Sequence, residues 1–119
     1  MAKNQVLEGI RKGQIIHTSG DIIFVGSQMI FNHEISNYEI ITEETRKSGT
    51  SMILRGAVGV ALLGGAGVLA ALTAKNKNTY IIAIEWNNQF LNSKEKKKGT
   101  KSIIEIDDKI YKRFIKMML

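Results

Sequence analysis

A run of nineteen residues without a charge, Gly56–Ala74, constrains the fold of this 119-residue chain more than any other feature. The run reads GAVGVALLGGAGVLAALTA, and Thr73 is its only polar side chain. Its length is close to the roughly 20 residues that cross a bilayer as a helix. Positive residues flank the run on both sides, namely Arg46, Lys47 and Arg55 before it and Lys75 and Lys77 after it.

Small residues recur in this run at helical spacing, which lets helices approach closely. Against one continuous helix, the centre carries Gly64, Gly65 and Gly67, and each interior glycine costs a helix about 1 kcal/mol relative to alanine. We therefore expect either one helix or a hairpin of two short helices. The predicted association or insertion surface is Gly56, Ala57, Ala61, Gly64, Gly65, Ala66, Ala70 and Ala74.

The position of the run in the chain bears on how it could meet a membrane. A single crossing would place Met1–Ser51 and Lys75–Leu119 on opposite sides. Neither half alone has enough strands for a stable sheet, because an isolated hairpin is marginal in water. If the halves pair, the run must leave and return on the same side. We favour a protein-packed helix or hairpin over shallow membrane insertion, and shallow insertion over a true span.

Length and composition indicate one domain, residues 1–119, with residues 43–78 as an apolar helical insertion. The chain has no cysteine, which excludes disulfides, thiolate metal sites and cysteine catalysis. No secretory signal is visible at the N-terminus, so we expect a cytoplasmic protein, with the inner face of the membrane as the alternative location. His17 and His33 do not have the spacing of a zinc motif, and we expect neither a metal nor a cofactor.

The net charge of +6 is carried unevenly. Such an excess can attract nucleic acid, anionic lipid or an acidic protein, although a solvated surface is the simpler interpretation. Only Phe90 is an aromatic neighbour of the main lysine cluster, so base stacking has little support and we do not expect nucleic acid to be the partner. The predicted basic patch is Lys94, Lys96, Lys97, Lys98 and Lys101.

The rest of the chain predicts a small β-domain. Asn4 can cap a short helix that ends at Gly13, and Phe24 and Phe31 are expected in the core. Asn87–Thr100 is expected to be a long basic hairpin loop, and Asp107 or Asp108 to cap an amphipathic final helix, Lys109–Met118. The predicted strands are Gln14–Ser19, Asp21–Val25, Gln28–Asn32, Tyr38–Thr42, Tyr80–Trp86 and Lys101–Ile106.

The segments GDIIFVGSQMIFN, ISNYEII, YIIAIEW and SIIEID, followed by a C-terminal helix, resemble a bacterial pleckstrin-homology or GRAM-like domain. The resemblance covers Gln14–Thr42 and Thr79–Leu119 and implies a small antiparallel PH-like sheet or barrel in the α+β class. Glu43–Asn78 departs from that family, as does the late position of the lysine cluster. Lipid-headgroup recognition is therefore not transferred to any residue.

No catalytic set is visible in the sequence. Ser19, Ser27 and Ser36 lack the context of a nucleophile elbow, and the glycines do not form a phosphate-binding loop. We expect a non-catalytic interaction module that self-associates or docks a protein partner through the Gly/Ala-rich run. The alternatives are a peripheral membrane adaptor that inserts the same run and a basic nucleic-acid-binding protein.

Overall fold

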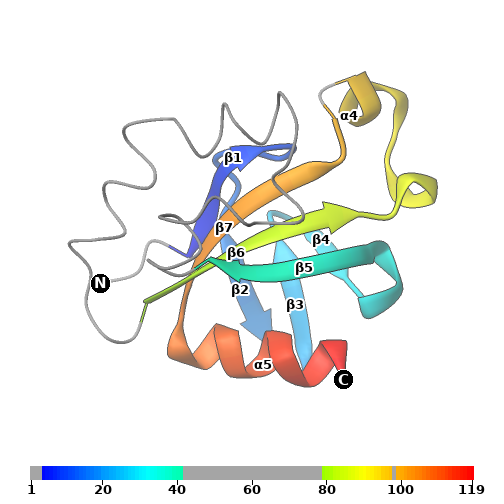
Figure 1. The fold of residues 1–119 in the computed structure, drawn as a ribbon. Coiled ribbons are helices and arrows are strands. Elements are labelled where there is room, and N and C mark those ends of the chain that lie inside the picture. Colours follow the sequence, from blue (N-terminus) through cyan, green and yellow to red (C-terminus); the bar gives the residue numbers. More distant parts are fainter. Residues whose placement is uncertain (1–3, 42–78, 98) are drawn as a thin grey trace.

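The computed structural model describes residues 4–41, 79–97 and 99–119 as a mixed α+β arrangement of two antiparallel sheets and a C-terminal helix (Figure 1). This confirms the predicted α+β class. The strands are β1 (Gln5–Gly9), β2 (Ile16–Ser19), β3 (Ile22–Val25), β4 (Gln28–Ile30), β5 (Ile35–Ile41), β6 (Thr79–Trp86) and β7 (Lys101–Asp107). The helices are η1 (Asn32–Glu34), η2 (Asn88–Phe90), α4 (Ser93–Lys97) and α5 (Asp108–Met118).

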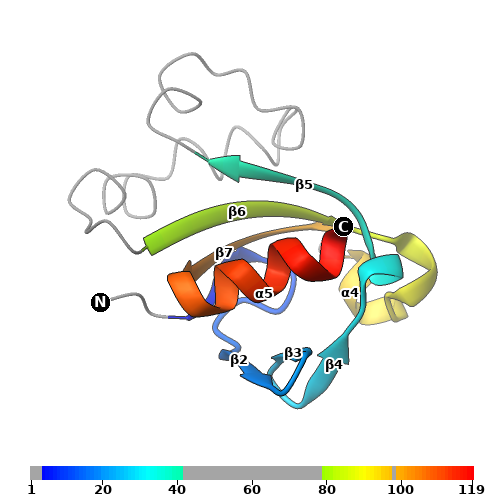
Figure 2. The same cartoon turned by 90° about the horizontal axis from the view of Figure 1, so that it is seen from below.

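The first sheet has the strand order β1-β7-β6-β5, and the second has the order β2-β3-β4. Figure 2 shows the two sheets on either side of α5, which lies across the open side between them. Isoleucines dominate the space enclosed by these three layers, and Ile10, Ile82 and Ile106 are completely buried there. The core therefore needs residues from both halves of the chain.

Helix α5 begins and packs as its sequence predicts. The Asp107 carboxylate accepts a hydrogen bond from the Ile110 backbone N–H at 2.9 Å, which caps the first turn. Ile110 and Phe114 are buried in the core, and the Phe114 ring meets Tyr38 edge-on with centroids 5.1 Å apart. The helix is thus held at its start by a cap and along its length by apolar packing.

The predicted N-terminal helix is wrong, because this segment is strand β1. Val6 pairs with Ile104 of β7, and Gly9 passes so close to the Lys101 carbonyl that a Cβ there would lie 2.1 Å from its oxygen. Asn4 caps no helix; its side chain bonds Asp107 through both of its polar atoms. The long-range ladder with β7 overrides a local pattern that suits a helix.

Two further expectations need correction. Phe31 is 42% exposed and Phe24 is only half-buried, because both lie outside the inward-facing set of Ile23, Val25 and Ile30. The segment predicted as one long loop contains η2 and α4, which starts after Asn92. The hairpin at Gly26-Ser27 and the strands on either side of it are confirmed.

Candidate functional site

The predicted association surface within Gly56–Ala74 lies outside the described residues, but its attachment points are described. Strand β5 ends at Ile41 and β6 begins at Thr79, and these strands are antiparallel neighbours in which Ile41 pairs with Ile81. The segment 42–78 therefore joins two adjacent strands of one sheet. This pairing rules out a single membrane crossing that would separate the two halves of the chain.

The four-stranded sheet has a second apolar face, here called the outer face, which points away from α5. Strand β6 alternates between Ile82 and Ile84 in the core and Ile81 and Ala83 on the opposite side. In the described ranges, four buried apolar residues lie outside the core cluster, and strand pairing places all of them on the outer face. They are Ile41, Ile81, Ala83 and Ile103, each at most 5% exposed.

This arrangement was only half predicted. The alternation of Tyr80–Trp86 predicted one fully buried face, whereas the middle of β6 is buried on both faces. A strand buried on both faces reads as a continuous apolar run, and the letters IIAI at positions 81–84 are such a run. That signal was available in the sequence.

Acidic residues border the apolar centre of the outer face. Glu39 pairs with Ala83, Glu105 with Ile81, and Glu8 with Ile103, so each glutamate shares that face with its partner. Glu85 and Lys101 form the next row. Glutamates thus outnumber lysine around the centre, although Glu8 also has an ion pair with Lys12.

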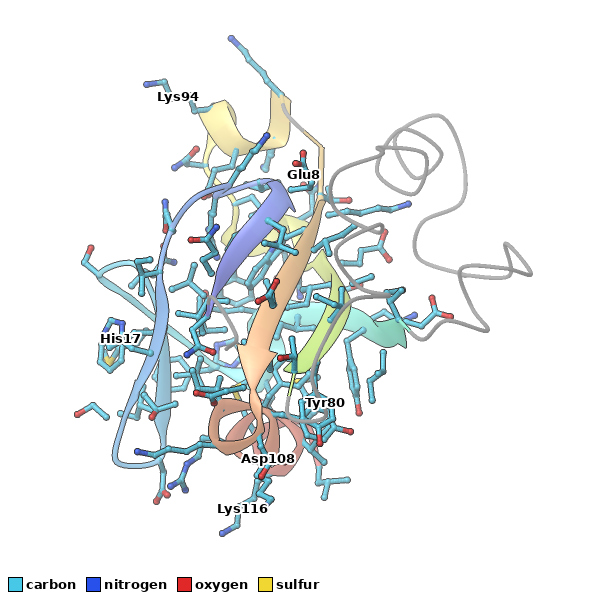
Figure 3. All side chains as sticks on the ribbon, turned by 90° about the vertical axis from the view of Figure 1, so that its left-hand side faces the viewer. Glu8, His17, Tyr80, Lys94, Asp108 and Lys116 are labelled. Carbon is cyan, nitrogen blue, oxygen red and sulfur yellow. The ribbon has the colours of Figure 1, made fainter. Side chains whose placement is uncertain are left out.

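The predicted basic patch is divided between elements. Lys94, Lys96 and Lys97 are exposed on α4, Lys101 belongs to β7, and Lys98 lies outside the described residues. Figure 3 shows Lys94 at one end of the molecule and Lys116 of α5 at the other. The basic residues of the tail therefore do not extend the lysine cluster into one larger surface.

A polar cluster around Arg11, which the sequence analysis missed, lies near α4. The Arg11 side chain is only 3% exposed, its Nε donates to Glu95 Oε2 at 2.8 Å, and its guanidinium carbon lies 4.5 Å from the Trp86 ring centroid. The Trp86 indole N–H donates to Ser102 Oγ at 2.8 Å, and Ser102 Oγ donates to the Ile10 carbonyl at 2.7 Å. No short motif marks this cluster in the sequence.

Burial and hydrogen bonding have opposing effects on the pKa of Glu95. Partial burial raises the pKa of Glu95, but hydrogen bonds from Arg11 and from the Asn92 backbone N–H outweigh burial and leave the pKa below its ordinary value. Glu95 therefore stays ionised beside Arg11. Even so, Arg11 Nη1 is buried, and no residue in the described part of the chain is its hydrogen-bond partner.

A second polar group connects the start of β6 to α5. Tyr80 donates its hydroxyl hydrogen to Asp108 at 3.1 Å, and Lys112 forms an ion pair with Asp108 at 3.0 Å (Figure 3 shows Tyr80 beside Asp108). The hydrogen bonds from Lys112 and Tyr80 lower the pKa of Asp108, and the bond to Asp108 raises the pKa of Tyr80. The Tyr80 ring also stacks on Tyr111. These contacts fix the helix against the strand.

The two histidines lie apart from these groups. His17 stacks on Phe24 with centroids 5.0 Å apart, and Figure 3 shows His17 on the side of the second sheet. His33 stacks on Phe31 and tilts against Phe90. Neither belongs to a cluster able to hold a metal ion, since the described part of the chain contains no group of three suitable ligands.

None of the helices in the described ranges is both long enough and apolar enough to cross a membrane. Comparison of the chain with protein-family models, curated proteins and solved structures finds no match. The site must therefore be interpreted from its own chemistry.

Proposed function

We propose that the chain is a non-catalytic interaction module in which Gly56–Ala74 mediates self-association or the docking of a protein partner. The observation that carries this proposal is the attachment of the insertion to a sheet with a second apolar face. Segment 42–78 leaves from Ile41 and returns at Thr79, directly beside Ile81 and Ala83. A strongly apolar segment is thus tethered next to a strongly apolar surface.

The fold supports a PH-like interpretation as part of the same proposal. The two described antiparallel sheets and the C-terminal helix that lies across the space between them are the parts that a PH-like or GRAM-like barrel requires. The insertion would be an apolar helix or helical hairpin between β5 and β6. In this interpretation the two sheets and α5 form a rigid frame, and the insertion between β5 and β6 contacts the partner.

In this proposal the larger apolar side chains of Gly56–Ala74 pack on the outer face. The small side chains of Ala57, Ala61 and Gly65 would then remain available for close contact with a second copy. Charge agrees with this orientation, because the outer face is bordered by glutamates while Arg55 and Lys75 flank the apolar run. Self-association would need no cofactor and no catalytic residue.

The test is light scattering coupled to size-exclusion chromatography of the full chain, with and without detergent. Ala61→Leu with Gly65→Leu adds bulk to the small-residue face, so the oligomer should dissociate. Gly67→Leu with Ala71→Leu adds the same number of carbons at positions outside the predicted surface and is the matched control, which should keep the oligomer. A monomeric wild-type chain that captures no partner through this segment would refute the proposal.

The membrane alternative predicts the opposite response to the same substitution. If the segment inserts in lipid, added leucine should increase the fraction that pellets with anionic liposomes, at about 0.8 kcal/mol per buried CH₂. Loss of self-association without a gain in pelleting favours the protein interface. A gain in pelleting without an oligomer favours the membrane adaptor.

A further inference from the structure

We infer that the cleft beside Arg11 is a binding site for a carboxylate group. The cleft has a volume of about 150 Å³, which is room for several water molecules. It lies between the loop after β1 and the start of α4. The described residues that line it are Ile10, Arg11, Gln14, Asn92, Lys94 and Glu95.

The first argument is that Arg11 is held in place but incompletely paired. Trp86 supports one face of the guanidinium and Glu95 accepts from Nε, so the side chain is fixed. Nη1 nevertheless lacks a hydrogen-bond partner among the described residues, although it is buried. Buried N–H groups of a charged side chain are normally satisfied, so an unsatisfied one on a residue that lines a cleft indicates that an acceptor binds there.

The second argument is the backbone of Arg11. Its φ is 65°, in the left-handed region that residues other than glycine seldom occupy. A glycine would adopt this conformation at lower cost, so the large side chain is placed here against a backbone preference. Strain of this kind is concentrated at binding sites.

The third argument identifies the ligand by charge and shape. Arg11 and Lys94 bring two positive charges to the cleft and Glu95 brings one negative charge, so the lining balances a single negative charge. A carboxylate carries that charge in a plane that matches the guanidinium, whereas a phosphate monoester carries about −1.5 to −2. The side-chain amides of Gln14 and Asn92 add neutral donors.

The chain contains its own reporter for this site, because Trp86 is the only tryptophan and contacts Arg11 directly. Acetate should change Trp86 emission along a saturable curve when it replaces chloride at constant ionic strength near neutral pH. A blocked peptide with one glutamate should compete if the natural carboxylate is a side chain of a protein. A small dicarboxylic acid that competes better than the peptide would indicate a free metabolite.

Three variants make the test specific. Arg11→Lys keeps the charge but loses the planar donors, and should weaken acetate binding at least tenfold. Arg11→Gly suits the backbone and should remove the response altogether. Lys12→Gln is the matched control, because Lys12 is the exposed neighbour whose partner is Glu8, and it should bind acetate like the wild type.

The inference is overturned if no carboxylate gives a saturable response at concentrations up to about 0.1 M, where even a very weak site would be occupied. It is equally overturned if Arg11→Lys responds like the wild type. Tighter binding of inorganic phosphate than of acetate would refute the assignment to a carboxylate. If Arg11→Gly does not fold, the wild-type chain is titrated with acetate and the Arg11 side-chain N–H signals are followed by NMR. Unchanged signals would overturn the inference.

Discussion

Replacement of Ser102 by alanine is the sharpest test of how this molecule is held together. Ser102 is completely buried and links two other buried groups, since it accepts from the Trp86 indole and donates to the Ile10 carbonyl. Alanine keeps the backbone and removes only the hydroxyl. The substitution therefore leaves one donor and one acceptor without partners in the core.

The expected cost follows from these two groups. Each buried polar group that loses its partner costs about 1–3 kcal/mol, so Ser102→Ala should destabilise the fold by about 2–6 kcal/mol. A chain of this length has a total stability of about 6–18 kcal/mol, so the loss is a large fraction of the whole. At about 4 °C per kcal/mol, the melting midpoint should fall by about 8–24 °C.

Circular dichroism during urea and thermal unfolding measures this cost without relying on Trp86 fluorescence. Ser19→Ala, an exposed serine on β2, is the matched control and should leave the midpoint unchanged. In a double-mutant cycle, Trp86→Phe removes the donor, so Ser102→Ala should cost at least 1 kcal/mol less in that background. A Ser102→Ala midpoint equal to that of Ser19→Ala, or a strictly additive cycle, would refute the reasoning.

Three other predictions test separate parts of the structure. Phe114→Ala should cost about 3–5 kcal/mol because its ring is buried against Tyr38, whereas Leu119→Ala, at a 96% exposed position, should cost nothing measurable in urea unfolding. Folding lowers the pKa of Glu95 from 4.5, so ionised Glu95 stabilises the fold above pH 4.5, and this stabilisation is lost as the pH falls through the lowered pKa. Thermal melts at a series of pH values should show this loss in the wild type and not in Glu95→Gln. Replacement of residues 43–77 by an Asn-Gly turn should expose the outer face and increase binding of a hydrophobic dye, and unchanged dye binding would show that segment 42–78 does not cover that face.

Strong local signals made much of the β-structure predictable. The Gly26-Ser27 turn between two short apolar runs correctly predicted β3 and β4, and the aspartate before an amphipathic stripe correctly predicted the start of α5. In both places the turn or cap chemistry and the hydrophobic pattern agree. A local prediction is reliable where the turn or cap residues and the hydrophobic pattern indicate the same structure.

The errors occur where a distant partner decides the structure. Val6 and Ile10 have the i, i+4 spacing of a helix, yet β1 is fixed by hydrogen bonds to β7, which is nearly the whole chain away in sequence. Arg11 reads as an ordinary surface arginine. Only the surrounding glycines, Gly9 and Gly13, both at positive φ, hint that the backbone there is unusual.

Strand β6 connects the two proposed binding regions, which adjoin its opposite ends. Its first residue, Thr79, follows the insertion, and its last, Trp86, supports Arg11 at the opposite end. Pairing with β5 on one side and β7 on the other holds the strand rigid between these ends. Because Thr79 and Trp86 lie at opposite ends of the strand, substitutions in the two regions should have additive effects. A carboxylate-bearing partner could then occupy the Arg11 cleft whether or not the insertion is engaged in self-association.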